Sequence, residues 1–540
     1  MKDNNLFISI YRNCYLRSLI RNNVFKDTII CIPSLEYLND NHQYLSVFSN
    51  DDKLQYNIFI QYTFNNKNSY QQFSHNSNRH LVNDLEWGKH DIIDFGILYD
   101  QVHRLSFCIQ QDSTISNVDK LPESTIVELN IDTQTHTRFV CSSLEKILLD
   151  LPKNLKVLKL SRLFILSSSD SKIQLPNSLV KLQYSGTGTE LDRFVIDTPN
   201  KILNGPCLKV YSTQDLQWLQ DKLWISDILM IQGVHQIPSH VRKIDLCVAL
   251  DKELVHCLPP RLEWLNVNKI RGPKNQQHVA LLLKQHLSKL RHLSLYVYIE
   301  NQLGKEPLFS ESLEYLYLSG GHKEIDGSMF PPKLKILNLG QYNRELKIGS
   351  LSNSITNLTL NYYDEPLTSS VLPDQLQSLC LFSFDNTIQA NCLPTSLTSL
   401  QLNIFSGSFE NVGTLDNLRY LKVHTLNQSM VDTLTNVNRI KLSFFNIAPN
   451  TSFITNTSIT NLYLQNTSYD GSTIADGFLP SSLVRLHLDG FRIQSIDTIP
   501  PSCVYLDYNH KNLDLTLIPQ SVKNIYFLEP KVLDTFIEYL

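Results

Sequence analysis

The residues able to do catalytic chemistry do not stand at catalytic spacings. The 18 glycines form neither G-x-x-x-x-G-K-[ST] nor G-x-G-x-x-G, and H-E-x-x-H and G-x-S-x-G are absent. The ten cysteines contain no C-x-x-C pair, which argues against a zinc ribbon. His75, His80 and His90 also lack metal-ligand spacing. The sequence therefore predicts a protein that is not an enzyme, with no catalytic residues, no cofactor and no metal site.

The chemistry that remains is recognition by aromatic and basic side chains. They recur two, four and six residues after the first apolar residue of a repeated motif, L-x-x-L-x-L. Trp, Tyr and Arg are enriched at binding hot spots because they bury a large area and keep a polar tip. The alternative is that aromatic residues simply favour strands and support one another across a sheet. The candidate protein-binding residues are Trp264, His292, Tyr296, Tyr315, Tyr317, Tyr420, Lys422, Arg439, Lys441, Tyr463, Arg485 and Tyr505.

Charge limits the class of partner. The chain has 48 Lys+Arg and 52 Asp+Glu, a net charge of −4, so it has no general basic field for nucleic acid or an anionic membrane. The basic residues Arg439 and Lys441 predict a local site for an acidic partner. No stretch reaches the ~18 apolar residues of a membrane span, and the first residues lack the pattern of a secretory signal. We expect protein partners, no nucleic acid, no membrane and a cytoplasmic location, with the nucleus as the alternative.

The candidate residues depend on the repeat for their positions. The motif begins at residues 334, 355, 376, 397 and 418, which are 21 residues apart. A fixed period of this length is typical of a solenoid, in which each unit packs only on its neighbours. The last two apolar residues of the motif are two apart, so they point to one side of a strand, and the residues between them point to the other side. The pattern predicts a β-rich solenoid with a parallel sheet, present as a monomeric array.

Four regions follow from the extent of the repeat. Residues 1–50 have apolar residues at helical spacing and predict a helical head, which is either a cap on the first repeat or a docking helix. Residues 51–100 predict an irregular cap of strand and loop, although 56–64 alternate as a strand does. Residues 101–529 carry the solenoid. Residues 530–540 predict a short capping helix.

The rest of each unit is also regular. A proline often stands three residues before the first leucine, as Pro373 and Pro394 do, and a serine such as Ser396 follows two positions later. These residues predict a corner that leads into the strand. Eight residues after the first leucine stands an aromatic residue, in the set Tyr342, Tyr363, Phe384, Phe405, Phe445 and Phe491.

Together these motifs resemble the FNIP repeat of social amoebae, a relative of leucine-rich repeats, and Phe445-Asn446-Ile447 comes nearest to its name. The resemblance implies an interaction module without known catalytic activity, in which the aromatic residue fills the turn in place of an Asn ladder. The opening segment is similar to a head that is likened to an F-box. We therefore expect a protein-interaction scaffold. The alternative is a substrate receptor of a ubiquitin ligase, with residues 5–45 as its adaptor-binding helices.

Overall fold

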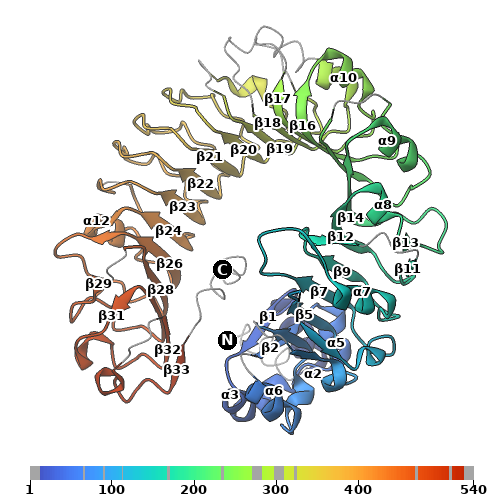
Figure 1. Ribbon diagram of the computed structural model, residues 1–540. Coiled ribbons are helices and arrows are strands. Elements are labelled where there is room, and N and C mark those ends of the chain that lie inside the picture. Colours follow the sequence, from blue (N-terminus) through green and yellow to red (C-terminus); the bar gives the residue numbers. More distant parts are fainter. Residues whose placement is uncertain are drawn as a thin grey trace. The chain divides into compact units, whose positions relative to one another are not determined.

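The computed structural model describes residues 13–64, 67–88, 92–111, 113–166, 171–232, 236–270, 282–296, 309–320, 325–410, 412–468, 472–509 and 514–527. The chain divides into two compact units, Met1–Gln232 and Gly233–Leu540. Each unit is built on a sheet of parallel strands that follow one another in chain order (Figure 1). The chain is therefore a β-rich solenoid, as its repeat predicts.

The first unit pairs each strand of its main sheet with the next one along the chain. The register places Ile30 beside Ile60 and Leu105 beside Leu129. The strands are β1 (Ile29–Ile32), β2 (Phe59–Phe64), β3 (Asp84–Trp87), β5 (Arg104–Cys108), β7 (Glu128–Asp132), β9 (Val157–Leu160), β12 (Lys181–Gly186), β14 (Asn204–Val210) and β15 (Asp227–Met230). Short parallel pairs outside this sheet join β4 (Ile92–Asp94) to β6 (Thr114–Ser116), β8 (Phe139–Val140) to β10 (Phe164–Ile165), and β11 (Ile173–Gln174) to β13 (Phe194–Val195).

Most helices of the first unit lie in the connections between these strands. They are α2 (Cys14–Val24), α3 (Leu35–Asp40), α4 (His42–Leu45), α5 (Asn50–Gln55), α6 (Lys67–Ser74), α7 (Ser142–Leu149), α8 (Gly188–Leu191) and α9 (Thr213–Leu219). One-turn 3₁₀ helices occur at Arg79–Leu81, Phe95–Ile97 and Val118–Lys120. Ser49 opens α5 with a capping box, in which its hydroxyl accepts from the Asp52 amide and the Asp52 carboxylate accepts from the Ser49 amide.

The parallel sheet begins earlier than the repeat motif suggests. β1, β2 and β3 precede residue 101, and Asp84 of β3 pairs directly with Arg104 of β5. β3 has the spacing of the motif in Val82, Leu85 and Trp87, whereas β1 and β2 lack its leucines and fill the core with other residues, among them Tyr62 and Phe64. The predicted loop after β2 contains α6 because Phe73 is buried and stacks on Tyr62, with 4.9 Å between ring centroids. Residues 1–50 therefore differ from a wholly helical head, since β1 belongs to the sheet. The F-box-like alternative stays a prediction, and residues 1–12 lie outside the described residues.

The second unit repeats the same strand with greater regularity. Leu358 pairs with Leu379 and Leu379 with Leu400, one repeat apart in each case. The strands of its main sheet are β16 (Lys243–Leu250), β17 (Trp264–Ile270), β18 (His292–Leu295), β19 (Tyr315–Leu318), β20 (Ile336–Leu339), β21 (Asn357–Leu360), β22 (Ser378–Leu381), β23 (Ser399–Leu402), β24 (Tyr420–Val423), β26 (Arg439–Phe444), β28 (Asn461–Asn466), β30 (Arg485–Asp489), β32 (Tyr505–Asn509) and β33 (Asn524–Phe527).

Short elements complete this unit. Two small parallel pairs join β25 (Thr425–Leu426) to β27 (Asn446–Ile447) and β29 (Ser472–Thr473) to β31 (Phe491–Arg492). The helices are α10 (Lys252–Cys257) and α12 (Gln428–Asp432), with 3₁₀ turns at Gly327–Met329, Ile496–Thr498 and Leu515–Leu517. Residues 282–286 are helical, within the insertion predicted at 278–290. The predicted C-terminal helix at 530–540 lies outside the described residues.

The leucines of the motif make the core. Leu376, Leu379 and Leu381 are each 0% exposed, whereas the intervening Ser378 and Cys380 face the other side of β22. The parallel pairing stacks equivalent leucines ~4.8 Å apart, so each repeat buries its apolar side against its neighbours. This arrangement leaves a continuous outward face on which polar and aromatic side chains can be displayed.

The aromatic residues of the turn form a second internal column. The rings of Tyr342, Tyr363, Phe384 and Phe405 are buried and stack in order, with centroids 6.4, 6.3 and 5.6 Å apart. Phe445 is an exception. It is 38% exposed, and Phe444 fills the core of its repeat.

A ladder of side-chain hydrogen bonds runs beside this column, one residue further along each repeat. The Asp364 amide donates to Asn343 Oδ1 at 2.9 Å, and the Asp385 amide donates to Asp364 Oδ1 at 2.8 Å. The Ser406 amide continues the series by donating to Asp385 Oδ1 at 2.9 Å. The turn therefore combines an aromatic column with a ladder at the ninth position after the first leucine.

The serines at the corners join repeats together. Ser396 Oγ donates to the carbonyl oxygens of Asp374 and Leu376 at 2.7 and 2.6 Å, and Ser178 Oγ donates to that of Leu155 at 2.8 Å. The acceptors belong to the preceding repeat, 20 to 23 residues earlier. These hydroxyls satisfy carbonyl groups at the bend, where the chain changes direction and ladder bonds end.

Candidate protein-interaction surface

The predicted binding residues lie on the outward face of the second unit's sheet, on or beside its strands. Alternation puts them there, because each one stands next to a buried leucine or its equivalent. The parallel register then decides which of them meet. It gathers them into two clusters separated by β20, β21, β22 and β23, whose outward residues at the same level are Ile336, Asn357, Ser378 and Ser399.

The first cluster is a column of stacked side chains across β16 to β19, which we name the aromatic stack: Lys243, Trp264, His292 and Tyr315. The ring centroids of Trp264 and His292 are 3.2 Å apart with an interplanar angle of 3°, and those of His292 and Tyr315 are 3.9 Å apart at 11°. Lys243 Nζ lies 4.6 Å from the Trp264 ring centroid. Residues 23 and 28 positions apart in sequence thus become nearest neighbours on adjacent strands.

The aromatic stack holds its histidine in the neutral state. Burial between the rings, together with the positive charge of Lys243, lowers the pKa of His292 to about 4. Burial also raises the pKa of the Tyr315 hydroxyl. Near pH 7 the imidazole is therefore uncharged and the phenol protonated. Tyr296 and Tyr317 extend the cluster on neighbouring strands, with ring centroids 4.8 Å apart.

The second cluster lies across β24 to β30, and we name it the Tyr420 column: Tyr420, Lys441, Tyr463 and His487. Lys441 is only 4% exposed, with its ammonium nitrogen 4.4 Å from the Tyr463 ring centroid and 5.8 Å from that of Tyr420. Tyr463 stacks on His487 with centroids 3.8 Å apart at 8°. The predicted basic site therefore divides: Lys441 is enclosed between aromatic rings, whereas Arg439 is exposed.

A change of register explains why Lys441 stands beside Tyr420. The motif step from 418 to 437 is 19 residues instead of 21. β26 consequently pairs two residues further along, with Tyr420 opposite Lys441 and Leu421 opposite Leu442. A shift of two keeps each side chain on its own face of the sheet, so the core is preserved while the outward neighbours change.

The remaining candidates surround a buried carboxylate. Arg485 Nε lies 3.2 Å from Asp507 Oδ2, and the Arg485 guanidinium also lies 5.6 Å from the Tyr505 ring centroid. His487 Nδ1 is 3.8 Å from the same Asp507 oxygen. Asp507 is 7% exposed, so this carboxylate fixes side chains at the edge of the Tyr420 column. Lys422 is partly buried and lies opposite Ser443.

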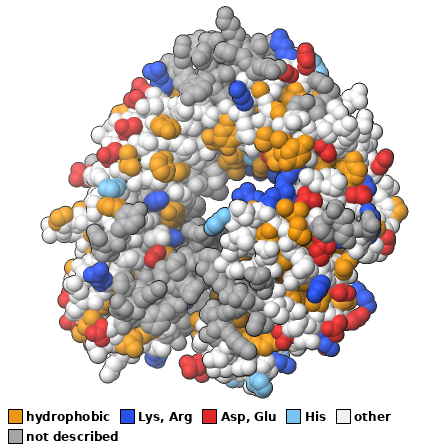
Figure 2. All heavy atoms as spheres, viewed as in Figure 1, with side chains coloured by type: hydrophobic (Ala, Val, Ile, Leu, Met, Phe, Trp, Pro, Cys, Tyr) orange, Lys and Arg blue, Asp and Glu red, His pale blue; other side chains and the backbone are white. Residues whose placement is uncertain are grey.

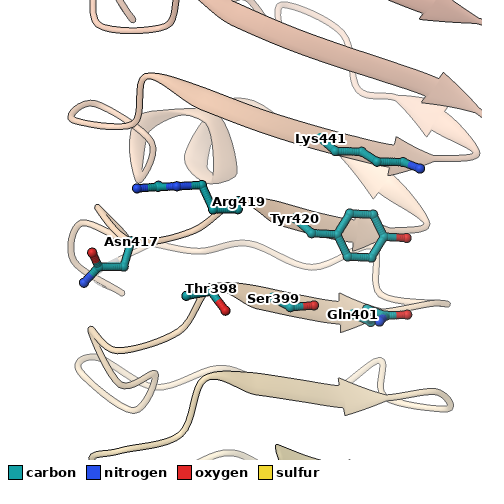
Figure 3. Close-up of a pocket in the computed structure, with 7 residues that line it drawn as sticks. All are labelled: Thr398, Ser399, Gln401, Asn417, Arg419, Tyr420 and Lys441. Carbon is teal, nitrogen blue, oxygen red and sulfur yellow. The ribbon is translucent and has the colours of Figure 1, made fainter. Parts of the chain in front are cut away.

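A pocket of about 560 Å³ opens beside the Tyr420 column. It is lined by Thr398, Ser399, Gln401, Asn417, Arg419, Tyr420 and Lys441. In Figure 3, Arg419 and Asn417 lie where the strands begin, whereas Gln401, Tyr420 and Lys441 extend towards the strand ends. The short side chains of Ser399 and Thr398 leave the space that Tyr420 borders. The pocket thus presents the Arg419 guanidinium at one end and the Tyr420 phenol, the Gln401 amide and the Lys441 ammonium at the other.

Some residues of these clusters were not predicted as sites. Lys243 stands two residues after Val241, so the same position rule identifies it. Gln401, four residues after Leu397, also has an outward position, but an amide was not among the aromatic and basic candidates. Arg419 and Asn417 carry no such signal, because the volume they enclose depends on the small residues of the neighbouring strand. The role of Asp507 was not predicted for a similar reason, because its partner Arg485 comes from another repeat.

Other kinds of site were sought in the same part of the molecule. Within the described ranges, no group of three or more His, Cys, Asp or Glu side chains could hold a metal ion. No described helix combines the length and apolar character needed to cross a bilayer. Acidic and basic side chains are interspersed on the face drawn in Figure 2.

The fold and this displayed face define the class: a parallel β solenoid of the leucine-rich-repeat type. The particular repeat is identified by a family model, FNIP Repeat, which matches residues 342–382. The chain therefore carries an FNIP repeat at these residues. The matched segment begins at Tyr342, the first ring of the internal aromatic column. A comparison with curated proteins found no match.

Several solved structures are similar to the chain at low sequence identity. CroV588, described as a novel circular LRR protein, is 18% identical, with 86% of this chain and 69% of that chain covered and a TM-score of 0.41. TLR13 in complex with ssRNA13 is 14% identical over 84% of this chain and 87% of that chain, with a TM-score of 0.44. The mouse RP105/MD-1 complex is 15% identical over 80% and 87%, with a TM-score of 0.43.

Proposed function

We propose that the chain is a non-enzymatic scaffold that binds a protein partner on the outward face of its second unit. The observation that carries the proposal is the Tyr420 column beside its pocket. There, Arg419 and Tyr420 of one repeat and Lys441 of the next border one concave volume of about 560 Å³. Interface hot spots have this composition and this pocketed geometry.

The chemistry of the pocket supports a peptide segment as the bound part of the partner. Extended backbone offers amide and carbonyl groups that can bond to Gln401, Asn417 and the Tyr420 hydroxyl. The guanidinium of Arg419 donates through Nη1 to the carbonyls of Asp416 and Leu418 at 3.1 and 2.9 Å, which positions it at one end. An acidic residue of the partner is the natural match for this cation.

The aromatic stack supports a protein partner over single-stranded nucleic acid. Proteins that bind single strands place bases on open ring faces. The faces of His292 are covered by Trp264 and Tyr315, and Lys243 lies over Trp264. The cluster therefore leaves ring edges for contact, and ring edges can pack against the side chains of a protein surface.

The proposal is tested by affinity purification with the full chain and three variants. Tyr420→Ala and Arg419→Ala alter the pocket, whereas Tyr362→Ala removes a tyrosine that is 60% exposed elsewhere in the unit. Hot-spot truncation typically costs at least about 1–2 kcal/mol, so a direct partner should be lost or bind roughly 5- to 30-fold more weakly. Thermal unfolding of each variant checks the fold.

The control variant should recover the same proteins as the wild type. Recovery of every partner at wild-type level by both pocket variants would disprove this location of the site. Arg419→Ala keeps the test decisive if Tyr420→Ala is destabilised, because the Arg419 guanidinium bonds only to carbonyls of its own turn in the described part of the chain.

A further inference from the structure

A cluster of basic side chains lies at the corner that leads into β16, β17 and β18. Arg242, Arg261, Lys289 and Arg291, with Glu263 among them, line a depression of about 340 Å³. The cluster belongs to the turn that precedes the strands, so it is separate from the pocket at Tyr420.

The backbone ladder fixes the spacing of these residues. The amide of Trp264 donates to the Arg242 carbonyl at 3.0 Å, and the amide of His292 donates to the Glu263 carbonyl at 3.0 Å. Arg242, Glu263 and Arg291 are therefore equivalent positions of consecutive repeats, ~4.8 Å apart along the stack. Arg261 and Lys289 each stand three residues before the first residue of a strand, so they too are neighbours.

Only part of this positive charge is balanced. Arg291 makes a two-pronged contact with Glu314, with Nη2 at 2.8 and 3.0 Å from the two carboxylate oxygens. Arg242 lies 3.9 Å from Glu263, and its Nη1 donates to the Ser239 carbonyl at 3.0 Å. Arg261 and Lys289 are exposed, and neither makes an ion pair among the described residues.

The balance of charges indicates which class of ligand the depression can bind. Four cations face two carboxylates, Glu263 and Glu314, which leaves an excess of two positive charges. A phosphate group carries about −1.5 to −2 charges near pH 7 and has several acceptor oxygens. Guanidinium groups match such oxygens because their N–H donors lie in a planar fork. Arg242 and Arg291 are already held by other contacts, so their side chains need little further ordering when a ligand binds.

We propose that this depression is a binding site for a phosphate-type oxyanion. The oxyanion comes either from free phosphate or from a phosphorylated segment of a protein. Arg261 and Lys289 supply the unbalanced positive charge, and Arg242 and Arg291 line the depression. The site uses none of the residues assigned to the proposed protein-binding pocket, so either proposal can fail alone.

The experiment measures binding of two probes to the full chain by isothermal titration calorimetry. The probes are inorganic phosphate and a short phosphoserine peptide, with the unphosphorylated peptide as reference. The test variant carries Arg261→Gln and Lys289→Gln. The matched control carries Arg344→Gln and Lys347→Gln, which removes the same charge from another exposed turn of the unit.

Because hydrogen bonds to charged groups are stronger than those between neutral groups, we expect the test variant to bind phosphate at least about tenfold more weakly than the control. Added NaCl should weaken binding to the wild type. If inorganic phosphate binds and displaces the peptide, the phosphoryl group itself is recognised. If only the phosphopeptide binds and the test variant loses it, the natural source is a protein. Equal binding by test and control variants would overturn the proposal, as would failure of both probes to bind the wild type.

Discussion

The internal aromatic column allows a sharp test of how the repeats hold together. Phe384 is 0% exposed, with the Tyr363 ring 6.3 Å and the Phe405 ring 5.6 Å away, centroid to centroid. Phe382, two residues earlier, is 52% exposed. Replacing each with alanine makes the same chemical change on the two sides of one chain segment.

The expected magnitudes differ widely. A buried Phe→Ala change typically costs about 3–5 kcal/mol, because the ring leaves a cavity that its neighbours fill only in part. In a solenoid this loss weakens the contacts with both adjacent repeats. At 1.4 kcal/mol per factor of ten, Phe384→Ala should raise the equilibrium constant for local opening roughly a hundred- to several-thousandfold. Phe382→Ala should change stability by no more than about 0.5 kcal/mol.

Hydrogen–deuterium exchange with mass spectrometry measures this effect repeat by repeat. Amides of β21, β22 and β23 should exchange faster in Phe384→Ala, while those of β7 in the other unit serve as an internal reference. Equal acceleration by Phe382→Ala would refute the assignment of inner and outer faces. Unchanged exchange in Phe384→Ala would refute the claim that the aromatic column couples the repeats.

Three further outcomes are expected. His103 is buried, and burial together with a nearby lysine charge lowers its pKa to about 4. The unfolded state then binds more protons between about pH 4 and 6.5, so the contribution of His103 to stability is complete above that window and is lost as the pH falls. Urea unfolding should show that stability declines less on acidification in His103→Gln than in the wild type, and an identical decline would contradict this. Gly490 and Gly477 share a φ of +75°, but a Cβ would lie 2.5 Å from the Asn466 carbonyl oxygen at Gly490 and would meet nothing within 4 Å at Gly477. Gly490→Ala should therefore lower the midpoint of thermal unfolding clearly more than Gly477→Ala, which carries only the ~1–2 kcal/mol of left-handed strain; equal losses would show that the contact is unimportant. Ser396→Ala removes a hydroxyl whose single proton is shared between two carbonyls of the preceding repeat and should cost about 0.5–1.5 kcal/mol in urea unfolding, whereas an unchanged midpoint would show that this contact contributes little.

The leucine spacing was sufficient to predict the strands, their parallel pairing and the face that each side chain takes. Leu337, Leu358 and Leu379 are buried on successive strands as their positions require. The period of two in a strand leaves no freedom once one face is committed to the core. The same logic identified the turn aromatics Tyr363 and Phe384, which recur 21 residues apart.

Where the motif is absent, the sequence was less informative. β1 pairs in the sheet of the first unit although it lacks the leucine triplet, and β3 has only its spacing, in Val82, Leu85 and Trp87. Their inclusion depends on the stack itself, because a neighbouring strand supplies hydrogen-bond partners for a segment whose own pattern is weak. The ladder through Asp364 and Asp385 was also missed, since its bonds join one side chain to the backbone of another repeat.

The sequence by itself thus determined the repeat, the core and the outward position of residues such as Trp264 and Tyr420. Only the tertiary structure decided which outward residues touch. The 19-residue step before β26 put Lys441, and not Arg439, beside Tyr420, and it enclosed that cation between two rings. The physical reason is that side-chain direction follows from local backbone geometry, whereas contact between repeats depends on the length and path of every connecting turn.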